Sequence, residues 1–356
     1  MTSTKLKFIA SLILSAATLP AMAAEPLHFT ATFLGAFGAT GINNAGDVVG
    51  LLPGASATGI GLYTGGSLHD LGTTGAGSTV AYGINDAGQI VGRTGDNRAF
   101  IYSGGSFNVF GSANSGAYAV NNAGQVAGYM QVGDTDHGFI YAGGTTTDVT
   151  PGNPWPGRSF SNAINNKGQV GGSMSVGATE TPIIYTNGVI TDLGGAVPDP
   201  FNANRRVVDL NDNGQVLLEV HQSNGDGTSA YFYDNGVATD LNGQDTSELF
   251  ASDINNGGLV VGKLGIEEGF VWQDGVLYNL NAITGGLGDW KIMDAIAIND
   301  HNQIAVLACR AFSNDCGTLL LSNVSAVPEP STYAMMAGGL GLLGFMARRR
   351  RSAPKA

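Results

Sequence analysis

The side chains best suited to holding a metal ion lie in the segment DLNDNG, residues 209–214. Asp209, Asn211 and Asn213 alternate before a glycine, which matches the first half of a calcium-binding loop. Such a loop needs a bidentate Glu at its twelfth position, but Val220 stands there. The segment therefore favours a structural turn over a metal site.

Histidines, hydroxyl groups and carboxylates form no catalytic pattern along the chain. No Ser, His and Asp arrangement stands out, and the glycine-rich stretches lack the strand-to-helix context of a phosphate-binding loop. Acidic loop residues such as Asp134 and Asp136 leave weak calcium binding as the one cofactor alternative, and we expect no other cofactor. The five histidines fall at unrelated places in the sequence: His28, His69, His137, His221 and His301. We therefore expect a protein that is not an enzyme.

The segment DLNDNG belongs to a motif that occurs seven times. The apolar residue before each Asn recurs at intervals of 42, 36, 44, 46, 44 and 44 residues. The copies are GINNAGDVVG (41), GINDAGQIVG (83), AVNNAGQVAG (119), AINNKGQVGG (163), DLNDNGQVLL (209), DINNGGLVVG (253) and AINDHNQIAV (297). A period of this size indicates a repeat architecture.

Each copy predicts the turn of a β-hairpin. Its first position is always Asn, whose side chain can bond to a backbone N–H two residues on. Its fourth position is Gly six times and Asn once, and these residues tolerate the positive φ that the turn requires. The pairs are Asn43 and Gly46, Asn85 and Gly88, Asn121 and Gly124, Asn165 and Gly168, Asn211 and Gly214, Asn255 and Gly258, and Asn299 and Asn302.

Four short strands fit into each period. About twenty residues after each of the first six turns, an apolar run leads into a Gly-Gly, Asn-Gly or Asp-Gly pair, as in AFIYSGG at 99 and GFVWQDG at 269. These pairs are typical of two-residue hairpins. Seven repeats of four antiparallel strands predict an all-β, seven-bladed β-propeller, with an open β-solenoid as the alternative. The seventh repeat lacks a fourth strand, so we expect residues 28–35, HFTATFLG, to complete it and close the ring.

Both ends of the chain carry export signals. Residues 1–23 combine two lysines, a short apolar run and an Ala-Met-Ala site, which indicates a secretory signal peptide rather than a membrane anchor. Residues 332–347 are uncharged and predict a single transmembrane helix, slightly shorter than the usual length of about 20 residues. The arginines that follow would hold its end in the cytoplasm. We therefore expect a propeller domain over residues 24–326 and a sorting signal over residues 327–356.

The two cysteines lie in the last repeat. Cys309 and Cys316 flank the link between its second and third strands. Because export places them in an oxidising compartment, the sequence favours a disulfide between them over a metal-binding or catalytic role.

The C-terminal tail closely resembles the PEP-CTERM sorting signal. The matching residues are Val327, Pro328, Glu329 and Pro330, followed by the glycine-rich span and by Arg348, Arg349, Arg350 and Arg351. In that family an exosortase, a membrane transpeptidase-like protease, recognises the signal, in Gram-negative bacteria that make exopolysaccharide. The resemblance implies an exosortase partner, transient anchoring in the inner membrane, and then release to the outer surface or extracellular matrix.

The repeats also resemble HAF repeats, which are named for a His-Ala-Phe tripeptide in the third strand. Arg98-Ala99-Phe100 and His137-Gly138-Phe139 each keep part of that tripeptide. The resemblance covers residues 36–322 and implies an extracellular location and a fold, without a known reaction.

The charge of the exported region limits its partners. Of 16 basic and 28 acidic residues, seven basic residues and one acidic residue lie outside 24–327, which leaves 9 against 27 and a net charge of −18. Nucleic acid is excluded as a partner, since phosphate binding needs a basic face. We expect a non-catalytic, surface-sorted protein associated with extracellular polysaccharide or the cell envelope. The alternative is a polysaccharide hydrolase or lyase with acidic loop residues on one propeller face.

Overall fold

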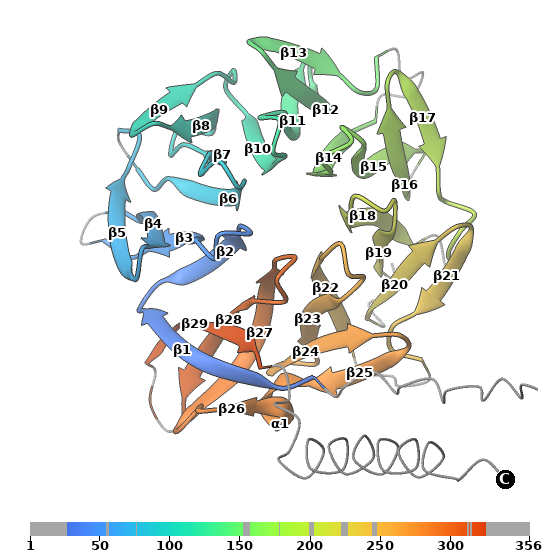
Figure 1. The fold of residues 1–356 in the computed structure, drawn as a ribbon. Coiled ribbons are helices and arrows are strands. Elements are labelled where there is room, and N and C mark those ends of the chain that lie inside the picture. The colour runs from blue at the N-terminus through green and yellow to red at the C-terminus, as the bar shows by residue number, and fades with distance from the viewer. Residues whose placement is uncertain are drawn as a thin grey trace, which may run out of the picture. The chain divides into compact units, whose positions relative to one another are not determined.

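The computed structural model describes residues 27–324, apart from 55–56, 76, 152–156, 178, 199–202, 222–226, 244–247, 312 and 314. Residues His28–Val324 form a compact unit of seven antiparallel sheets around a central axis (Figure 1). This arrangement is a seven-bladed β-propeller, which confirms the predicted fold and excludes the open solenoid. The signal peptide and the sorting signal, with its predicted transmembrane helix, lie outside the described residues. Within the described residues, no helix is long and apolar enough to cross a membrane.

The first six blades each contain four strands in chain order, with the first strand nearest the axis. Blade 1 contains β2 (Gly38–Ile42), β3 (Val48–Leu52), β4 (Gly59–Thr64) and β5 (Ser67–Gly72); blade 2 contains β6 (Val80–Ile84), β7 (Ile90–Arg93), β8 (Ala99–Ser103) and β9 (Ser106–Val109); blade 3 contains β10 (Ser115–Val120), β11 (Val126–Val132), β12 (Thr135–Ala142) and β13 (Thr145–Asp148). Blade 4 contains β14 (Ser159–Ile164), β15 (Val170–Val176), β16 (Thr179–Thr186) and β17 (Val189–Asp192); blade 5 contains β18 (Asn204–Leu210), β19 (Val216–His221), β20 (Thr228–Asp234) and β21 (Val237–Asp240); blade 6 contains β22 (Leu249–Ile254), β23 (Val260–Leu264), β24 (Glu268–Gln273) and β25 (Val276–Asn279).

Blade 7 is assembled from both ends of the propeller. It contains β27 (Trp290–Ile298), β28 (Ile304–Arg310), β29 (Cys316–Asn323) and, as its outer strand, β1 (Phe29–Gly35). Strand β1 pairs antiparallel with β29 from Phe29 opposite Asn323 to Gly35 opposite Thr318, which confirms the predicted closure. Two short elements were not foreseen: the helical turn α1 (Leu280–Ile283), and β26 (Thr284–Gly285), which pairs parallel with β1. Cys309 and Cys316 form a disulfide between β28 and β29.

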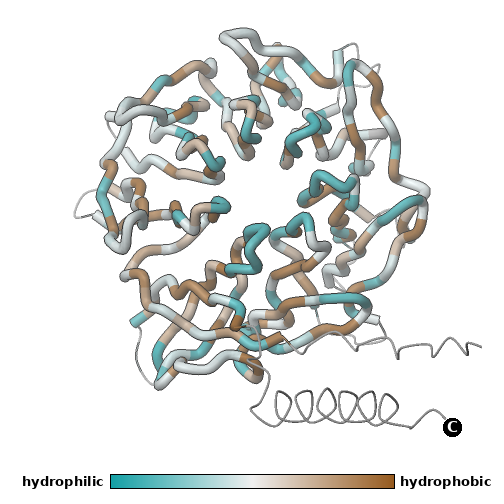
Figure 2. The backbone as a smooth tube through the Cα atoms, viewed as in Figure 1, coloured by the Kyte–Doolittle hydropathy of each residue, from teal (hydrophilic) through white to brown (hydrophobic). Residues whose placement is uncertain are grey.

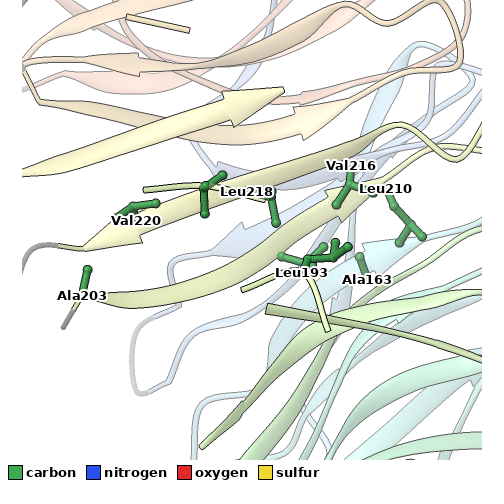
Figure 3. Packing of buried hydrophobic residues seen from close by; sticks show 9 residues of the cluster. Ala163, Leu193, Ala203, Leu210, Val216, Leu218 and Val220 are labelled. Atoms are coloured by element: carbon green, nitrogen blue, oxygen red, sulfur yellow. The ribbon is translucent and has the colours of Figure 1, made fainter. Parts of the chain in front are cut away.

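Apolar side chains of neighbouring blades interlock to form the core. Val49 of blade 1 packs in one cluster with Ala81 and Ile90 of blade 2. Figure 3 shows the equivalent cluster between blades 4 and 5, which includes Leu193 and Leu218. Such burial favours folding in proportion to the apolar area removed from water, about 25 cal/mol per Å². The blades therefore stabilise one another, as the repeat predicts.

Every inner strand carries a β-bulge at the same place. In blade 2, Ala81 pairs with Gly92 and Gly83 pairs with Val91, so that Tyr82 is left without a partner in the ladder. In blade 2 the strands lie so close that a Cβ atom on Gly92 would lie 2.0 Å from the carbonyl oxygen of Val80. The same close approach explains the glycine that ends five copies of the motif, whereas blades 5 and 7 hold Leu218 and Val306 at this position.

Candidate functional site

The Asn turns surround one end of the central channel, where Figure 2 shows hydrophilic segments. In the first turn, the side-chain oxygen of Asn43 accepts hydrogen bonds from the backbone N–H groups of Ala45 at 3.1 Å and Asp47 at 2.9 Å. The N–H of Gly46 donates to the carbonyl of Asn43 at 3.0 Å, and its φ is +82°. In the seventh turn, Asn302 takes the glycine's place at φ +57°.

The first Asn of each turn also binds the next blade. Its Nδ2 donates to the backbone carbonyl of the equivalent Asn at 2.8 to 3.2 Å, and the last bond returns from Asn299 to Asn43. The members of this closed ring, which we call the Asn ring, are Asn43, Asn85, Asn121, Asn165, Asn211, Asn255 and Asn299. Because these side chains are buried, each unmade hydrogen bond would be costly.

A second closed ring lies beside the first. The backbone N–H at the second turn position donates to the side-chain oxygen of the second residue in the next blade, at 2.7 to 2.9 Å. The members are Asn44, Asp86, Asn122, Asn166, Asp212, Asn256 and Asp300. Burial raises the pKa of Asp212, but hydrogen bonds from Asn166 and Asn256 outweigh burial and hold that pKa below its ordinary value. The need for an acceptor oxygen explains why this position is always Asn or Asp.

The calcium-loop side chains point to different partners. Asn211 belongs to the Asn ring, and Asn213 Nδ2 donates to the carbonyl of Asn256 at 2.8 Å. Asp209 is directed instead toward Asp253 of blade 6. Across the described part of the chain, no group of three or more His, Cys, Asp or Glu side chains is placed to hold a metal ion.

Asp209 and Asp253 form a half-buried pair of carboxyl groups beside the central channel, between blades 5 and 6. Asp253 accepts backbone N–H groups of Ile254 and Ile298, each at 2.8 Å, and also a hydrogen bond from Asp209. Desolvation raises the pKa of both carboxyl groups, and the charge of Asp253 raises that of Asp209 further, well above its ordinary value. Asp209 is therefore the partner that holds the proton, and it donates a hydrogen bond to Asp253.

One hydroxyl, histidine and carboxylate do meet, contrary to the expectation from the sequence. In blade 3, His137 Nδ1 lies 2.8 Å from Asp148 Oδ2 and Nε2 lies 3.1 Å from Thr135 Oγ1. The pairing of β12 with β13 brings Asp148 beside His137, which their separation in sequence conceals. The Thr135 hydroxyl also contacts the carbonyl of Val132 at 3.3 Å, and this cluster lines neither the channel nor the pocket described next.

A pocket of about 440 Å³ lies toward the other end of the channel, near the starts of the inner strands. We call it the mouth pocket. Its lining residues come from blades 2 to 5: Tyr82, Tyr118, Phe160, Asn162, Ser173, Glu180 and Arg206. Four successive repeats therefore contribute to one site, although no single repeat contains it.

Aromatic rings form part of the lining of the mouth pocket. Tyr82 and Tyr118 meet edge to face with ring centroids 5.3 Å apart. Tyr129 lies behind them, 5.5 Å from Tyr118 and 5.5 Å from Phe160. Burial, together with neighbouring Tyr129, raises the pKa of Tyr118 to about 12, so its hydroxyl remains a hydrogen-bond donor at neutral pH.

Charged groups form another part of the lining, together with groups packed behind it. Arg206 Nε and Nη2 donate to Glu219 Oε2 at 3.1 and 2.7 Å, and His221 Nε2 lies 3.1 Å from the same oxygen. The side chain of Glu219 is only 3% exposed, whereas that of Arg206 is 47% exposed. Burial raises the pKa of Glu219, but the hydrogen bond with His221 and the charge of Arg206 outweigh burial and leave that pKa lowered. Glu180 completes this part of the lining and accepts from Ser173 Oγ at 3.4 Å.

The residues of the mouth pocket stand where the repeats differ most. The unpaired bulge position holds Thr40, Tyr82, Tyr118, Asn162, Val208, Ser252 and Ile296 in blades 1 to 7. The cross-strand pair two residues earlier is Gly38 with Leu51, Val80 with Arg93, Gly116 with Tyr129, Phe160 with Ser173, Arg206 with Glu219, Phe250 with Lys263 and Asp294 with Leu307. A position-by-position comparison of the seven copies would have marked these sites, because they vary while the turn residues and the closing glycine recur.

Residues 326–351 match the PEP-CTERM protein-sorting motif. This motif is a signal recognised by exosortase, and it indicates export across the inner membrane with sorting at the C-terminus. The match confirms the sorting signal read from the sequence. The likeness of the repeats to HAF repeats stays a prediction.

Comparison with solved structures bears on the fold. The chain is similar to the β-propeller domain of the trilobed protease from Pyrococcus furiosus, at 10% identity over 85% of this chain and 100% of that one, with a TM-score of 0.50. It is similar to YCF48 bound to D1 peptide, at 13% identity over 85% and 99%, with a TM-score of 0.49. It also spans about half (52%) of an acylaminoacyl peptidase from Pyrococcus horikoshii, at 11% identity over 84% of this chain and a TM-score of 0.49. No curated protein matches the sequence. The similarity to the propeller domain of the trilobed protease, at 10% identity, shows the propeller fold alone.

Proposed function

We propose that this protein is a surface-sorted β-propeller that binds extracellular polysaccharide and catalyses no reaction. The lining of the mouth pocket carries the proposal: the aromatic side chains of Tyr82, Tyr118 and Phe160 line the same pocket as the polar side chains of Asn162, Glu180 and Arg206. The sorting motif supplies the context, because it directs the chain through the inner membrane. We propose that cleavage near Pro328-Glu329-Pro330 then releases the propeller to the outer surface or matrix.

The aromatic and polar lining residues of the mouth pocket suit the apolar and polar groups of a sugar ring. The C–H groups on one face of a pyranose carry partial positive charge and pack against the negative face of an aromatic ring. Its hydroxyl groups both donate and accept, so they pair with carboxamide, carboxylate and guanidinium groups. A volume of about 440 Å³ falls in the range of small-ligand sites. A short segment of a sugar chain fits this combination of shape and chemistry.

The carboxylates of the mouth pocket favour binding over hydrolysis. Most glycoside hydrolases place two carboxyl groups about 5 to 10 Å apart across the bond that is cut. Glu180 is the one carboxylate among the described lining residues. Glu219 stands nearby, but it is buried and its Oε2 already contacts Arg206 and His221. The alternative, a polysaccharide hydrolase or lyase, would need a second acid that can reach the ligand.

A glycan array probed with residues 24–326, followed by calorimetry on the best ligand, tests the proposal. We expect Tyr118→Ala and Phe160→Ala each to weaken binding at least about tenfold, since stacking surface is lost. Tyr278→Ala, on the outer strand of blade 6, is the matched control and should leave the affinity unchanged. Absence of any glycan binding would refute the proposal. Release of reducing ends from the bound polysaccharide would favour the hydrolase alternative.

A further inference from the structure

We infer that the mouth pocket selects uncharged sugar chains and rejects acidic ones, because the buried carboxylate of Glu219 neutralises its one lining cation. This inference rests on the proposed function and names the ligand class of the same site. It concerns the lining residues Arg206 and Glu180 and the buried Glu219, whereas Arg93 is hydrogen-bonded to Tyr129 and is not among the lining residues.

Arg206 is already paired before any ligand arrives. Its Nε and Nη2 both donate to Glu219 Oε2, at 3.1 and 2.7 Å. The guanidinium has five N–H donors, so those that Glu219 does not engage remain for sugar hydroxyl groups. Its positive charge, however, is balanced at close range by a carboxylate that is 3% exposed and therefore weakly screened. The pair offers directed hydrogen bonds without the net positive charge that would attract a uronate or sulfate group.

Glu180 makes the summed charge of Arg206, Glu219 and Glu180 negative. It lines the mouth pocket, and it takes part in none of the ion pairs found among the described residues. The exported region as a whole adds a net charge of −18, from 9 basic and 27 acidic residues between 24 and 327. An acidic sugar would therefore bring its carboxylate toward an unpaired carboxylate on a strongly acidic protein. Repulsion of this kind is a common basis of specificity.

The position of Glu219 argues against a purely structural role. In the other six blades the same site on the second strand holds Leu51, Arg93, Tyr129, Ser173, Lys263 and Leu307, so the fold does not need a carboxylate there. Burying a carboxylate is costly unless it is paired. Its cross-strand partner Arg206 is also the residue that reaches the mouth pocket. Glu219 therefore acts as a positioning residue that orients Arg206 and neutralises its charge.

The test compares neutral gluco- and galacto-oligosaccharides with oligogalacturonates of equal length, titrated into residues 24–326 at low salt. We expect the oligogalacturonates to bind at least about tenfold more weakly than the best neutral ligand. The difference should narrow as salt is raised, because screening weakens the repulsion. Equal or tighter binding of oligogalacturonates would overturn the inference while leaving the proposed function intact. If no sugar of either class binds, the proposed function fails and the inference fails with it.

Two variants separate charge selection from a structural effect. Glu219→Gln keeps a side-chain oxygen for Arg206 but removes the balancing charge, so we expect oligogalacturonate binding to strengthen about tenfold while neutral binding changes less than about twofold. Glu180→Gln should shift selectivity in the same direction. Because Glu180 lies outside the pair of Arg206 and Glu219, this variant still tests the inference if Glu219→Gln does not fold. Asp240→Asn, on the outer strand of blade 5, is the charge-matched control and should shift neither. Equal weakening of both ligand classes in Glu219→Gln, or no gain for oligogalacturonates in Glu180→Gln, would contradict the inference.

Discussion

The half-buried pair of Asp209 and Asp253 makes a prediction that separates two chemically similar substitutions. Asp253 accepts three hydrogen bonds, from Ile254 N–H, Ile298 N–H and Asp209, and therefore behaves as the carboxylate. Asp209 is the protonated partner, because burial and the charge of Asp253 raise its pKa. Asp209→Asn replaces the O–H donor with an N–H donor and keeps an oxygen for Ile254 N–H, which lies 3.2 Å from Asp209 Oδ2. It should therefore preserve the network.

The sign of the pH effect follows from the proton that Asp209 keeps. An unfolded Asp titrates near pH 3.9, whereas folded Asp209 holds its proton to higher pH. Its contribution to stability is thus fully present below about pH 4, and is lost as the pH rises toward the folded pKa. Each pH unit between the unfolded and the folded pKa of Asp209 lowers the free energy of unfolding by about 1.4 kcal/mol. Asp209→Asn abolishes this loss, so we expect stabilisation of about 1 kcal/mol or more at pH 8 and little change near pH 4.

Asp253→Asn should act in the opposite direction. Its amide offers one oxygen where the carboxylate had two, so the N–H of either Ile254 or Ile298 would face an NH₂ group. A buried donor left unpaired costs about 1 to 3 kcal/mol. Urea unfolding of residues 24–326 at several pH values between 4 and 9 measures both variants. A large destabilisation by Asp209→Asn at pH 8, or a harmless Asp253→Asn, would refute the assignment of the proton.

Four further outcomes follow from the fold and the tail. Asn165→Asp keeps the oxygen that bonds within its own turn but removes the Nδ2 donor to the next blade. It should lower the free energy of unfolding, measured with denaturant, by about 1 to 3 kcal/mol. Deletion of residues 27–35 removes the outer strand of blade 7, and calorimetry with light scattering should show a sharply lower Tm and oligomers formed through the exposed edge. Gly124→Val should destabilise the fold by about 1 to 3 kcal/mol, because φ is +74° and the new Cβ would lie 3.1 Å from a Gln89 oxygen. Gly143→Val, at φ +57° in open space, measures the backbone part of that destabilisation alone. A tolerated Gly124→Val would contradict the turn geometry. Mass spectrometry of the surface-located protein should find a chain that begins near Ala24 and lacks residues 332–356, whereas an intact arginine cluster would indicate a plain membrane anchor.

The repeat by itself determined the parts of this protein that depend on local interactions. An Asn side chain reaches backbone groups two and four residues on, so the turn can be recognised from Asn43 and Gly46 alone. Counting four strands in each period, with one missing from the last, was enough to predict seven blades and the role of β1. The sorting signal is likewise a linear motif, and its residues are adjacent in the chain.

Only the tertiary structure decided which side chains meet between blades. The second turn position bonds to a residue 36 to 46 positions away, or 256 across the closure, so its purpose appears only when the ring is closed. The bulge in each inner strand changes the alternation of side chains and leaves Tyr82 and Tyr118 to line the channel. Arg206 and Phe160 then reach the same pocket from different repeats. The period of a sequence records what its copies share, whereas this site is built from the positions where they differ.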